Sequence, residues 1–356
     1  MDRKTFIKNL SLASAAIPFF TEVDGMTMQN NKTYVKDPQI IRPKALEAGD
    51  TIGIISPASA VFETEPYAIA KENLEAMGLK VKMGKHVNTR YGHLAGTDEQ
   101  RASDLNGMFK DKEVQAIIAL RGGSGSARLL DKLDYDSIKN NPKIFIGYSD
   151  ITALHLAIFK MTGLVTYHGP VAVSSWNPFS RAIFKDLLFK KEKILYKNPS
   201  EIDKNQLVET KNRIRTIASG QVKGRLLGGN LSVLTGIMGS PYFPTDWGDK
   251  LLYLEDVGEE IYAVDRMFSQ IYLAGVFSQI KGFIFGKCSG CSPGGSGYGS
   301  LTLEEVIDHY IKPLGIPAFS GAMIGHITDN DTIPNGIEAS LDADKGIIQL
   351  LNPAVE

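Results

Sequence analysis

Residues 144–159 read IFIGYSDITALHLAIF, and this stretch decides the fold class of the first half of the chain. The run over 143–146 predicts a buried strand, residues 147–150 a sharp turn, and residues 151–161 a helix. A short strand that passes through a tight turn into a helix is typical of parallel sheets, because their strands are joined by crossover helices. The stretch therefore predicts an α/β unit.

The same alternation extends on both sides of this unit. The run VQAIIAL at 114–120 is continuously apolar, as expected for a strand that is buried on both faces. Further strands are predicted at 51–55, 79–83 and 164–167, and helices at 66–77, 97–109 and 127–133. We therefore predict an N-terminal α/β domain with a parallel sheet over residues 44–175.

A second domain is predicted after a less regular connection over 176–219. It begins at Gly220 and extends to residue 356. The pattern predicts a helix over 231–239, strands over 251–254 and 282–286, helices over 260–273 and 301–311, and a hairpin over 337–351. Two domains also agree with the length of 356 residues, since one domain holds roughly 150 residues.

The composition excludes several classes of protein. Lys and Arg number 39 and Asp and Glu number 40, so a net charge of −1 gives no long-range field toward nucleic acid or an anionic membrane. Hydrophobic residues make up 43% and charged residues 22%, which excludes intrinsic disorder as the main state. We expect neither a nucleic-acid partner nor stable insertion in a membrane.

Residues 1–20 predict an export signal. Arg3, Lys4 and Lys8 form a basic head, and the following residues 9–20 are mostly apolar or small. This run suits the hydrophobic region of a signal peptide and is too short to span a bilayer. Residues 21–43 then form a linker, and the exported protein is expected in the periplasm. The alternative is a cytoplasmic protein with a frayed N-terminus.

Ser149 is the first candidate for chemistry, because it lies in the turn between a strand and a helix. There a hydroxyl projects from the sheet, and N–H groups at the start of the helix can stabilise an oxyanion. This is the arrangement of a nucleophile elbow. Ile151 stands where the G-x-S-x-G motif has its second glycine, which disfavours the ordinary α/β-hydrolases. The alternative role of Ser149, or of Asp150, is to cap the helix.

A glycine-rich loop follows the strand predicted at 114–120. Residues 121–125 read RGGSG, and glycines allow backbone amides to approach an anion closely. A dinucleotide-binding fingerprint is disfavoured, because Arg128 replaces the third glycine of G-x-G-x-x-G and the loop follows an interior strand. An oxyanion hole or a plain tight turn fits better, and we predict no cofactor.

A serine nucleophile needs a base, and that base needs an orienting carboxylate. His326 lies where an extended segment runs into a loop rich in Asp, Asn and Gly. His168 ends a predicted strand and could line the same crevice. Glu255, at the end of the strand LLYLE, is the candidate carboxylate. The alternatives are a solvated loop histidine for His326 and a charge near a helix start for Glu255.

No metal site is predicted. Cys288 and Cys291 have C-x-x-C spacing, but there is no second pair and no H-E-x-x-H motif. His326, Asp329 and Asp331 could ligate a metal, although such acidic runs usually form turns. The two cysteines could form a local disulfide or remain free thiols.

Taken together, these segments resemble the LD-carboxypeptidase family of serine peptidases, which includes muramoyltetrapeptide carboxypeptidases and microcin C self-immunity hydrolases. The matching segments lie in family order over about residues 44–350: IIALRGGSGSARLLDKLDYD, IFIGYSDITALHLAI, YHGP, GRLLGGNLSVLTGIMGSPY, LLYLEDVGEEIYAVDRM and IPAFSGAMIGHITDNDTIPNG. The resemblance implies a catalytic triad of Ser149, Glu255 and His326. It also implies an oxyanion hole formed by the backbone amides of Gly123 and Asp150.

The resemblance further implies an architecture. The family has a flavodoxin-like parallel α/β domain that carries the nucleophile, and a C-terminal domain with a β-barrel-like sheet and helices. The second domain would carry the glutamate and histidine of the triad, and the active site would lie between the domains. Family members are often dimers, so we expect a homodimer. Ser124 stands where the family often has Tyr or Phe, which leaves the shape of the substrate open.

The implied activity is that of a metal-independent serine carboxypeptidase that removes the terminal D-alanine from cell-wall tetrapeptides during peptidoglycan recycling or remodelling. Arg121 could bind the substrate's terminal carboxylate, or could brace the domain interface. One alternative is hydrolysis of an acyl-nucleotide conjugate of the microcin C type. Trp176 would then stack on the base, or would otherwise pack at the domain junction. A second alternative is a periplasmic peptide-binding module without activity.

Overall fold

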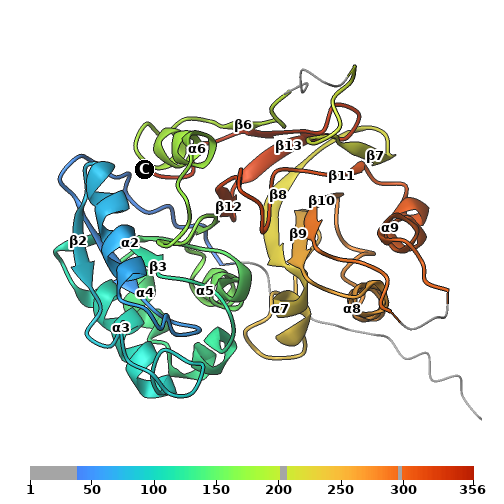
Figure 1. Ribbon diagram of the computed structural model, residues 1–356. Helices are drawn as coiled ribbons and strands as arrows, with labels where there is room; N and C mark the ends of the chain where they lie inside the picture. Colours follow the sequence, from blue (N-terminus) through green and yellow to red (C-terminus); the bar gives the residue numbers. More distant parts are fainter. Residues whose placement is uncertain (1–37, 201–206, 296–298) are drawn as a thin grey trace, which may run out of the picture. The chain divides into compact units, whose positions relative to one another are not determined.

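The computed structural model describes residues 38–200, 207–295 and 299–356, all within one compact unit, Val35–Glu356. The predicted signal peptide and residues 21–37 of the predicted linker lie outside the described residues. Among the helices that are described, none is both long and apolar enough to cross a membrane. Two sheets organise the described chain, and Figure 1 shows them beside each other.

The first sheet is the parallel α/β sheet that the sequence predicts. Its strands run in the order β12-β5-β4-β3-β1-β2, and β1 to β5 are mutually parallel. The order β2-β1-β3-β4-β5 is that of flavodoxin-like folds. The bounds are β1 Thr51–Ile55, β2 Lys80–Met83, β3 Val114–Ala119, β4 Ile144–Gly147, β5 Thr166–His168 and β12 Ile333–Asn335.

Helices α2, α3 and α5 connect these strands where the sequence predicts them, whereas α4 and α6 were not predicted. Thr97 and Gln100 form a reciprocal capping box at the start of α3, so the sequence signal for that helix is explicit. The helix predicted over 127–133 is instead the 3-10 helix η1. The bounds are α2 Glu65–Ala76, α3 Asp98–Lys110, η1 Ser126–Lys132, α4 Tyr135–Asn140, η2 Ser149–Ile151, α5 Thr152–Thr162 and α6 Pro178–Leu188.

Helix α5 is buried on nearly all sides, which explains its apolar sequence. Nine of its 11 residues are buried, because it packs on β5 and also against β8 and α7 of the second half. The helix that follows the Ser149 turn is therefore held between the two halves. This position fixes the turn relative to the second sheet.

The second sheet has eight strands in the order β6-β14-β13-β8-β9-β10-β11-β7. Strands β8 to β11 are parallel, and the outer pairs are antiparallel. The sheet curls into a half-barrel, so the predicted fold class is confirmed for both halves. The bounds are β6 Leu195–Tyr196, β7 Arg215–Ala218, β8 Gln221–Asn230, β9 Lys250–Val257, β10 Gly282–Ser289, β11 Ala318–Ser320, β13 Glu338–Asp342 and β14 Ile347–Leu350.

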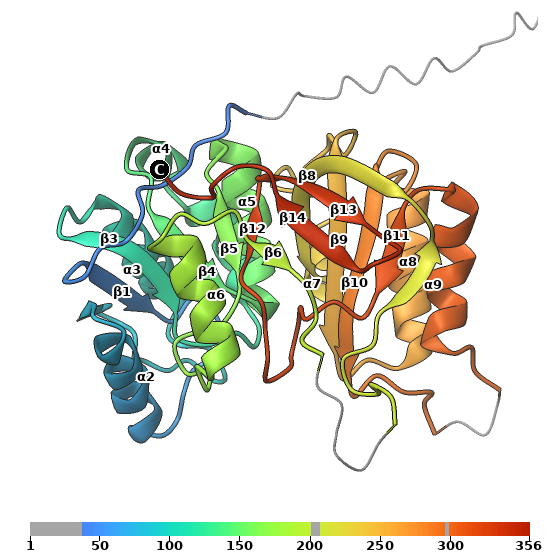
Figure 2. The same ribbon diagram turned by 90° about the horizontal axis from the view of Figure 1, so that it is seen from above.

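Three helices accompany this sheet, with bounds α7 Leu231–Gly236, α8 Ile261–Leu273 and α9 Leu303–Ile311, followed by the 3-10 helix η3 Lys312–Leu314. Figure 2 shows α8 and α9 side by side. Strand β12 follows β11 in the chain but pairs antiparallel with β5 of the first sheet. Figure 2 shows it, in red, beside the green β5. A strand from the second half of the chain thus completes the first sheet, and the predicted domain boundaries stay predictions.

Helix α6 and strand β8 also differ from the sequence prediction. The connection over 176–219 is partly regular, because Asn177 caps α6 by accepting a hydrogen bond from Ser180 N and Pro178 occupies its first turn. Strand β8 precedes the helix predicted over 231–239 and was itself not predicted. Gly228 allows close strand pairing, because a Cβ there would lie 1.8 Å from Tyr253 O.

Candidate active site

Ser149 lies in a strained turn immediately after β4. Its φ of 64° is in the left-handed region, which costs a non-glycine residue about 1–3 kcal/mol and persists only where the surroundings impose it. Gly122 makes room for it, since a Cβ on Gly122 would lie 3.1 Å from Ser149 Oγ. Gly147 similarly accommodates the buried Ile151, whose side chain would lie 2.9 Å from a Cβ on Gly147. The isoleucine that breaks the G-x-S-x-G motif therefore packs under the turn.

The helix-cap alternative does not describe this turn. Neither η2 nor α5 has a side-chain cap hydrogen bond. The carboxylate of Asp150 points instead to the glycine loop, where its Oδ2 accepts a hydrogen bond from Ser126 N at 2.8 Å. Burial raises the pKa of Asp150 and outweighs the hydrogen bonds from Ser126, which lower it. The Asp150 carboxylate thus ties the Ser149 turn to the loop over 121–125.

The glycine loop is held from its other side by Ser59. Ser124 N donates to Ser59 Oγ at 3.0 Å, and Ser59 N donates to Gly122 O at 3.4 Å. Gly123 has a φ of 116°, and a Cβ on it would lie 2.3 Å from Ser59 Oγ, so no other residue fits. Within the described chain, no group accepts a hydrogen bond from the amide of Gly123. That amide remains available to an anion.

Glu255 and His326 form a hydrogen-bonded pair in the second half. Glu255 lies on β9 and is fully buried, and its Oε2 accepts a hydrogen bond from His326 Nδ1 at 2.8 Å. The bond leaves Nε2 of His326 without the proton in the neutral imidazole, so Nε2 is the basic nitrogen. The His326 side chain is 19% exposed, so it reaches solvent while its partner does not. The arrangement suits a base with an orienting carboxylate.

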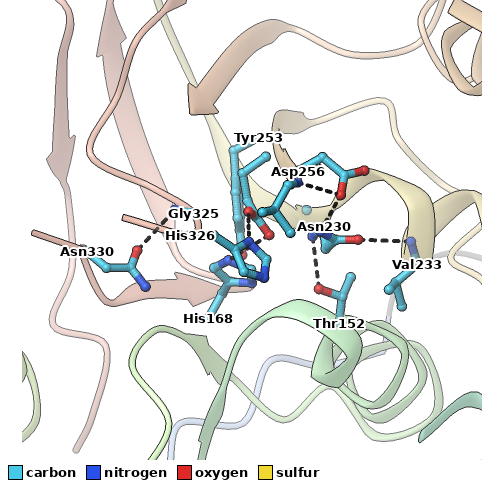
Figure 3. A network of polar contacts seen from close by, with 12 residues as sticks. Thr152, His168, Asn230, Val233, Tyr253, Asp256, Gly325, His326 and Asn330 are labelled. Atoms are coloured by element: carbon cyan, nitrogen blue, oxygen red, sulfur yellow. Dashed lines mark hydrogen bonds and ion pairs between the residues drawn. The ribbon is translucent and has the colours of Figure 1, made fainter. Parts of the chain in front are cut away.

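A glycine makes this pairing sterically feasible. Gly325 has a φ of 127°, and a Cβ on it would lie 2.8 Å from Glu255 Oε2. Its N–H donates to Asn330 Oδ1 at 3.1 Å, which closes the loop that presents His326. Figure 3 shows Gly325, His326 and Asn330 in this arrangement. Position 325 therefore needs glycine for steric reasons, and position 326 supplies the imidazole.

His168 lies behind this pair and has no exposed surface. Its Nε2 is 3.8 Å from Glu255 Oε1, which is too long for a hydrogen bond. Burial lowers its pKa well below the usual value, so the ring is neutral. Figure 3 shows it close to His326 and beside Tyr253, whose ring centroid is 5.6 Å away. The structure does not bring His168 to the surface of the site.

Two cavities meet at His326. A cavity of about 690 Å³ is lined by Ser149, Arg121 and the glycine loop, and one of about 760 Å³ is lined by Trp176 and by residues of the His326 loop. His326 and Tyr148 line both, with their rings 4.8 Å apart. We call them the smaller and the larger cavity. No hydrogen bond joins Ser149 Oγ to His326 among the described residues.

Two other predicted contact residues, Arg121 and Trp176, line these cavities. Arg121 lines the smaller cavity, where its Nη1 donates to Ala60 O at 3.1 Å, and no carboxylate of the described residues pairs with it. Trp176 lines the larger cavity, although only 5% of the residue is exposed. Its ring packs edge-on to Phe184 and its Nε1 donates to Ala172 O.

A polar network that the sequence analysis missed connects the two halves near the site. Asn230 N donates to Thr152 Oγ1 at 2.9 Å, and Asn230 Nδ2 donates to Asp256 Oδ1 at 2.9 Å. Thr152 begins the helix that follows Ser149, and Asp256 follows Glu255 on β9. Figure 3 shows the three residues in line. The cap position of Asn230 at α7, where its Oδ1 accepts from Val233 N, was the only local signal.

The possible metal ligands are not gathered. No group of three or more His, Cys, Asp or Glu that could hold a metal is found in the described ranges. Cys288 and Cys291 form a disulfide. Asp329 accepts a hydrogen bond from Asn177 Nδ2, and Asp331 is buried, which raises its pKa well above the usual value. These residues have structural partners or surroundings that disfavour a cation.

Comparison with known proteins identifies the class. Residues 52–169 match the LD-carboxypeptidase N-terminal domain, and residues 223–341 match the LD-carboxypeptidase C-terminal domain. The chain belongs to the LD-carboxypeptidase family, and this membership makes it a hydrolase of the serine-type carboxypeptidase class.

Individual relatives agree with this membership. A probable murein peptide carboxypeptidase of Bacillus subtilis is 38% identical over 306 residues, which are 85% of this chain and 91% of the relative. A murein tetrapeptide carboxypeptidase of Pseudomonas aeruginosa is 31% identical over 83% of this chain and 94% of the relative. The structure of the microcin C7 self-immunity protein MccF in complex with aspartyl sulfamoyl adenosine superposes with a TM-score of 0.79. It is 30% identical and covers 89% of this chain and 100% of that one.

Proposed function

We propose that the protein is a serine carboxypeptidase that removes the terminal D-alanine from cell-wall tetrapeptides. One observation carries this proposal: the buried Glu255–His326 pair opens on the same cavity as Ser149 in its strained turn. The names of the relatives from Bacillus subtilis and Pseudomonas aeruginosa support murein peptides as the substrate class. The bond cleaved would join an L-centre, such as that of meso-diaminopimelate or L-lysine, to D-alanine.

The proposed mechanism assigns one role to each of these side chains. Ser149 Oγ attacks the carbonyl carbon while Nε2 of His326 takes its proton, and the buried Glu255 carboxylate stabilises the imidazolium. The backbone amides of Gly123 and Asp150 stabilise the oxyanion, and removal of one such donor typically costs about 10²–10³-fold in kcat. The substrate must bring Ser149 and His326 into hydrogen-bond contact, as is common when catalytic contacts tighten in the complex.

The second half of the reaction restores the enzyme. His326 passes its proton to the leaving amine, so D-alanine departs and Ser149 holds the acyl group as an ester. Water then attacks the ester while His326 again acts as the base, which releases the shortened peptide. No step in this sequence requires a metal. We expect EDTA to leave the rate unchanged, and loss of activity that zinc restores would contradict this mechanism.

Hydrolysis of an acyl-nucleotide conjugate is the second candidate. It is favoured by the structural similarity to MccF, which has been solved with aspartyl sulfamoyl adenosine, and by the position of Trp176 in the larger cavity. Because the Trp176 indole is nearly buried and packs on Phe184, only a small part of the ring is available to stack on a base. A peptide-binding module without activity is less favoured, since it has no need for a buried carboxylate that orients a histidine.

The test compares the two candidate substrates directly. The protein is incubated with a purified muropeptide tetrapeptide and, separately, with aspartyl sulfamoyl adenosine, and the products are followed by mass spectrometry. We expect free D-alanine and tripeptide from the first. Cleavage of the second substrate without release of D-alanine would select the alternative, and binding without cleavage of either would select the binding module.

Two further aspects belong to this proposal. The basic head and apolar run of residues 1–20 support export to the periplasm, and the family resemblance supports a homodimer. Fractionation of cells and the molar mass measured by light scattering test them. Protein retained in the cytoplasm at full length, or a monomer at micromolar concentration, would contradict them.

A further inference from the structure

The larger cavity contains a lysine that the proposed chemistry does not use. Lys287, near the end of β10, lines this cavity together with His326, Trp176 and Asp329. Across the ranges that the structure describes, its ammonium group has no ion pair and no hydrogen bond with the protein. A half-buried cation without a protein partner, next to the candidate base, is a group that a substrate can bind.

The backbone of Lys287 is held firmly against the His326 loop. Its N–H donates to Ile324 O at 2.9 Å, and its carbonyl oxygen lies 3.3 Å from the position of a Cβ on Gly325. The pairing of β10 with β9 shifts register between Phe285 and Cys288, so Lys287 lies within an irregularity of the strand. Such irregularities redirect side chains near active sites. The backbone of Lys287 is therefore fixed against the two residues that immediately precede His326.

The charges that face the larger cavity favour an anion. Lys211 lines it as a second lysine, while Asp329 is the only carboxylate among the described residues of its lining. The Asp329 carboxylate accepts a hydrogen bond from Asn177 Nδ2 at 2.9 Å. Burial lowers the pKa of Lys287, because a desolvated ammonium is less stable, and a bound carboxylate would offset this cost.

We propose that Lys287 binds a carboxylate of the peptide substrate in the larger cavity, and that this contact determines which peptides the site accepts. The inference rests on the proposed carboxypeptidase function. A tetrapeptide offers two carboxylates near the scissile bond. One is the terminal carboxylate of D-alanine, and the other is the side-chain carboxylate of meso-diaminopimelate. Both present the same chemistry to the lysine, and the substrates of the experiment distinguish them.

The experiment uses three peptides and three proteins. The peptides are the diaminopimelate tetrapeptide, its C-terminal amide, and the tetrapeptide with L-lysine at the third position, which lacks the side-chain carboxylate. The proteins are wild type, Lys287→Met, and Lys281→Met as a matched control. Lys281 is an exposed lysine just before the same strand, at its opposite end. Release of D-alanine, or of its amide, gives kcat/KM for each combination.

We expect Lys287→Met to lower kcat/KM for the diaminopimelate tetrapeptide by about 10-fold or more, the usual effect of losing a charged hydrogen bond. We expect Lys281→Met to match wild type and Lys287→Arg to restore part of the loss. The effect of Lys287→Met should disappear for one of the other peptides. If it disappears for the amide, Lys287 binds the terminal carboxylate. If it disappears for the L-lysine peptide, it binds the side-chain carboxylate.

Two outcomes overturn the inference alone. Lys287→Met could retain the kcat/KM of wild type on all three peptides, or could lose the same factor on all three, which a general structural defect would produce. In either case, a melting temperature equal to that of wild type shows that Lys287→Met is folded. Failure of the proposed function looks different, because wild type then releases no D-alanine from any of the peptides. That result removes the inference together with the function on which it rests.

Discussion

The two halves of the candidate site hold their functional side chains in different ways. Ser149 is positioned locally, by a left-handed backbone conformation at the first residue of η2, just after β4. Glu255 and His326 are 71 residues apart in the chain, and they meet because β9 and the loop after β11 converge. The position of Ser149 therefore depends on a short segment, whereas the Glu255–His326 pair depends on the whole second sheet.

The electrostatic environments of Glu255 and Ser149 also differ. Glu255 is fully buried and has one strong hydrogen-bond partner, so loss of that partner leaves a carboxylate in an apolar interior. Ser149 has no charge and faces a cavity. Changes in the second half should therefore affect catalysis and folding together, while changes at Ser149 should affect catalysis alone.

The largest effect expected in the second half follows from Glu255→Gln. An amide keeps the size of the side chain but can donate to His326 Nδ1, which favours the wrong tautomer of the imidazole. We expect kcat to fall by about 10⁴-fold, as for the equivalent change in other triads. Glu304→Gln, on the exposed surface of α9, is the control and should leave kcat unchanged. Activity of Glu255→Gln within tenfold of wild type would exclude Glu255 as the orienting carboxylate.

A smaller effect is expected from Gly325→Ala, which separates geometry from charge. The added methyl would lie 2.8 Å from Glu255 Oε2, so the carboxylate or the His326 loop must move. A shift of about 1 Å in a catalytic group costs on the order of 10²-fold in rate. The strained backbone should also lower the free energy of unfolding by about 1–3 kcal/mol.

Gly239→Ala is the matched control for this change. Gly239 also has a positive φ, 88°, but a Cβ there meets no atom within 4 Å. It should lose stability through backbone strain and keep its kcat. Denaturant titration and steady-state rates measure the two quantities separately. Equal loss of kcat in both variants would show that strain alone, and not the contact with Glu255, explains the effect.

The smallest effect is expected from Thr152→Val, which tests the connection between the two halves. The substitution keeps the shape of the side chain and removes the acceptor of Asn230 N, which leaves a buried amide without a partner. We expect a loss of about 1–3 kcal/mol in the free energy of unfolding. We also expect kcat to fall by roughly tenfold, because the helix after Ser149 is then less firmly held to the end of β8.

Thr235→Val serves as the comparison. Its hydroxyl donates only to carbonyl oxygens of its own helix, Leu231 O and Ser232 O. It should destabilise less and leave kcat unchanged. If Thr152→Val keeps the kcat of wild type while it loses stability, the network joins the halves without positioning the site.

The sequence predicts most of the fold where local signals agree with the final structure. The strand-turn-helix unit around Ser149 and the capped helix α3 are of this kind. Strand β8 was not predictable in this way, because Gly228 and Gly229 signal turns locally and their close approach to Tyr253 and Thr152 exists only in the folded chain.

The candidate site shows the same limit. The residue patterns propose Ser149, Glu255 and His326 as candidates but leave an alternative role open for each, and the family resemblance favours the catalytic roles. The network of Thr152, Asn230 and Asp256 has no sequence signal beyond a helix cap, since its members come from three separate elements. The burial of His168 was equally hidden, because a strand-end histidine can face either a cavity or the core.

The central claim is that Ser149 is the nucleophile of a D-alanine-releasing carboxypeptidase, and one measurement tests it most directly. Release of D-alanine from the tetrapeptide is followed for wild type, Ser149→Ala and the distant control Ser278→Ala, with thermal melting measured on each. The account predicts a fall in kcat of about 10⁴-fold or more for Ser149→Ala alone, with the melting temperature of wild type. Turnover of Ser149→Ala near that of wild type would contradict it.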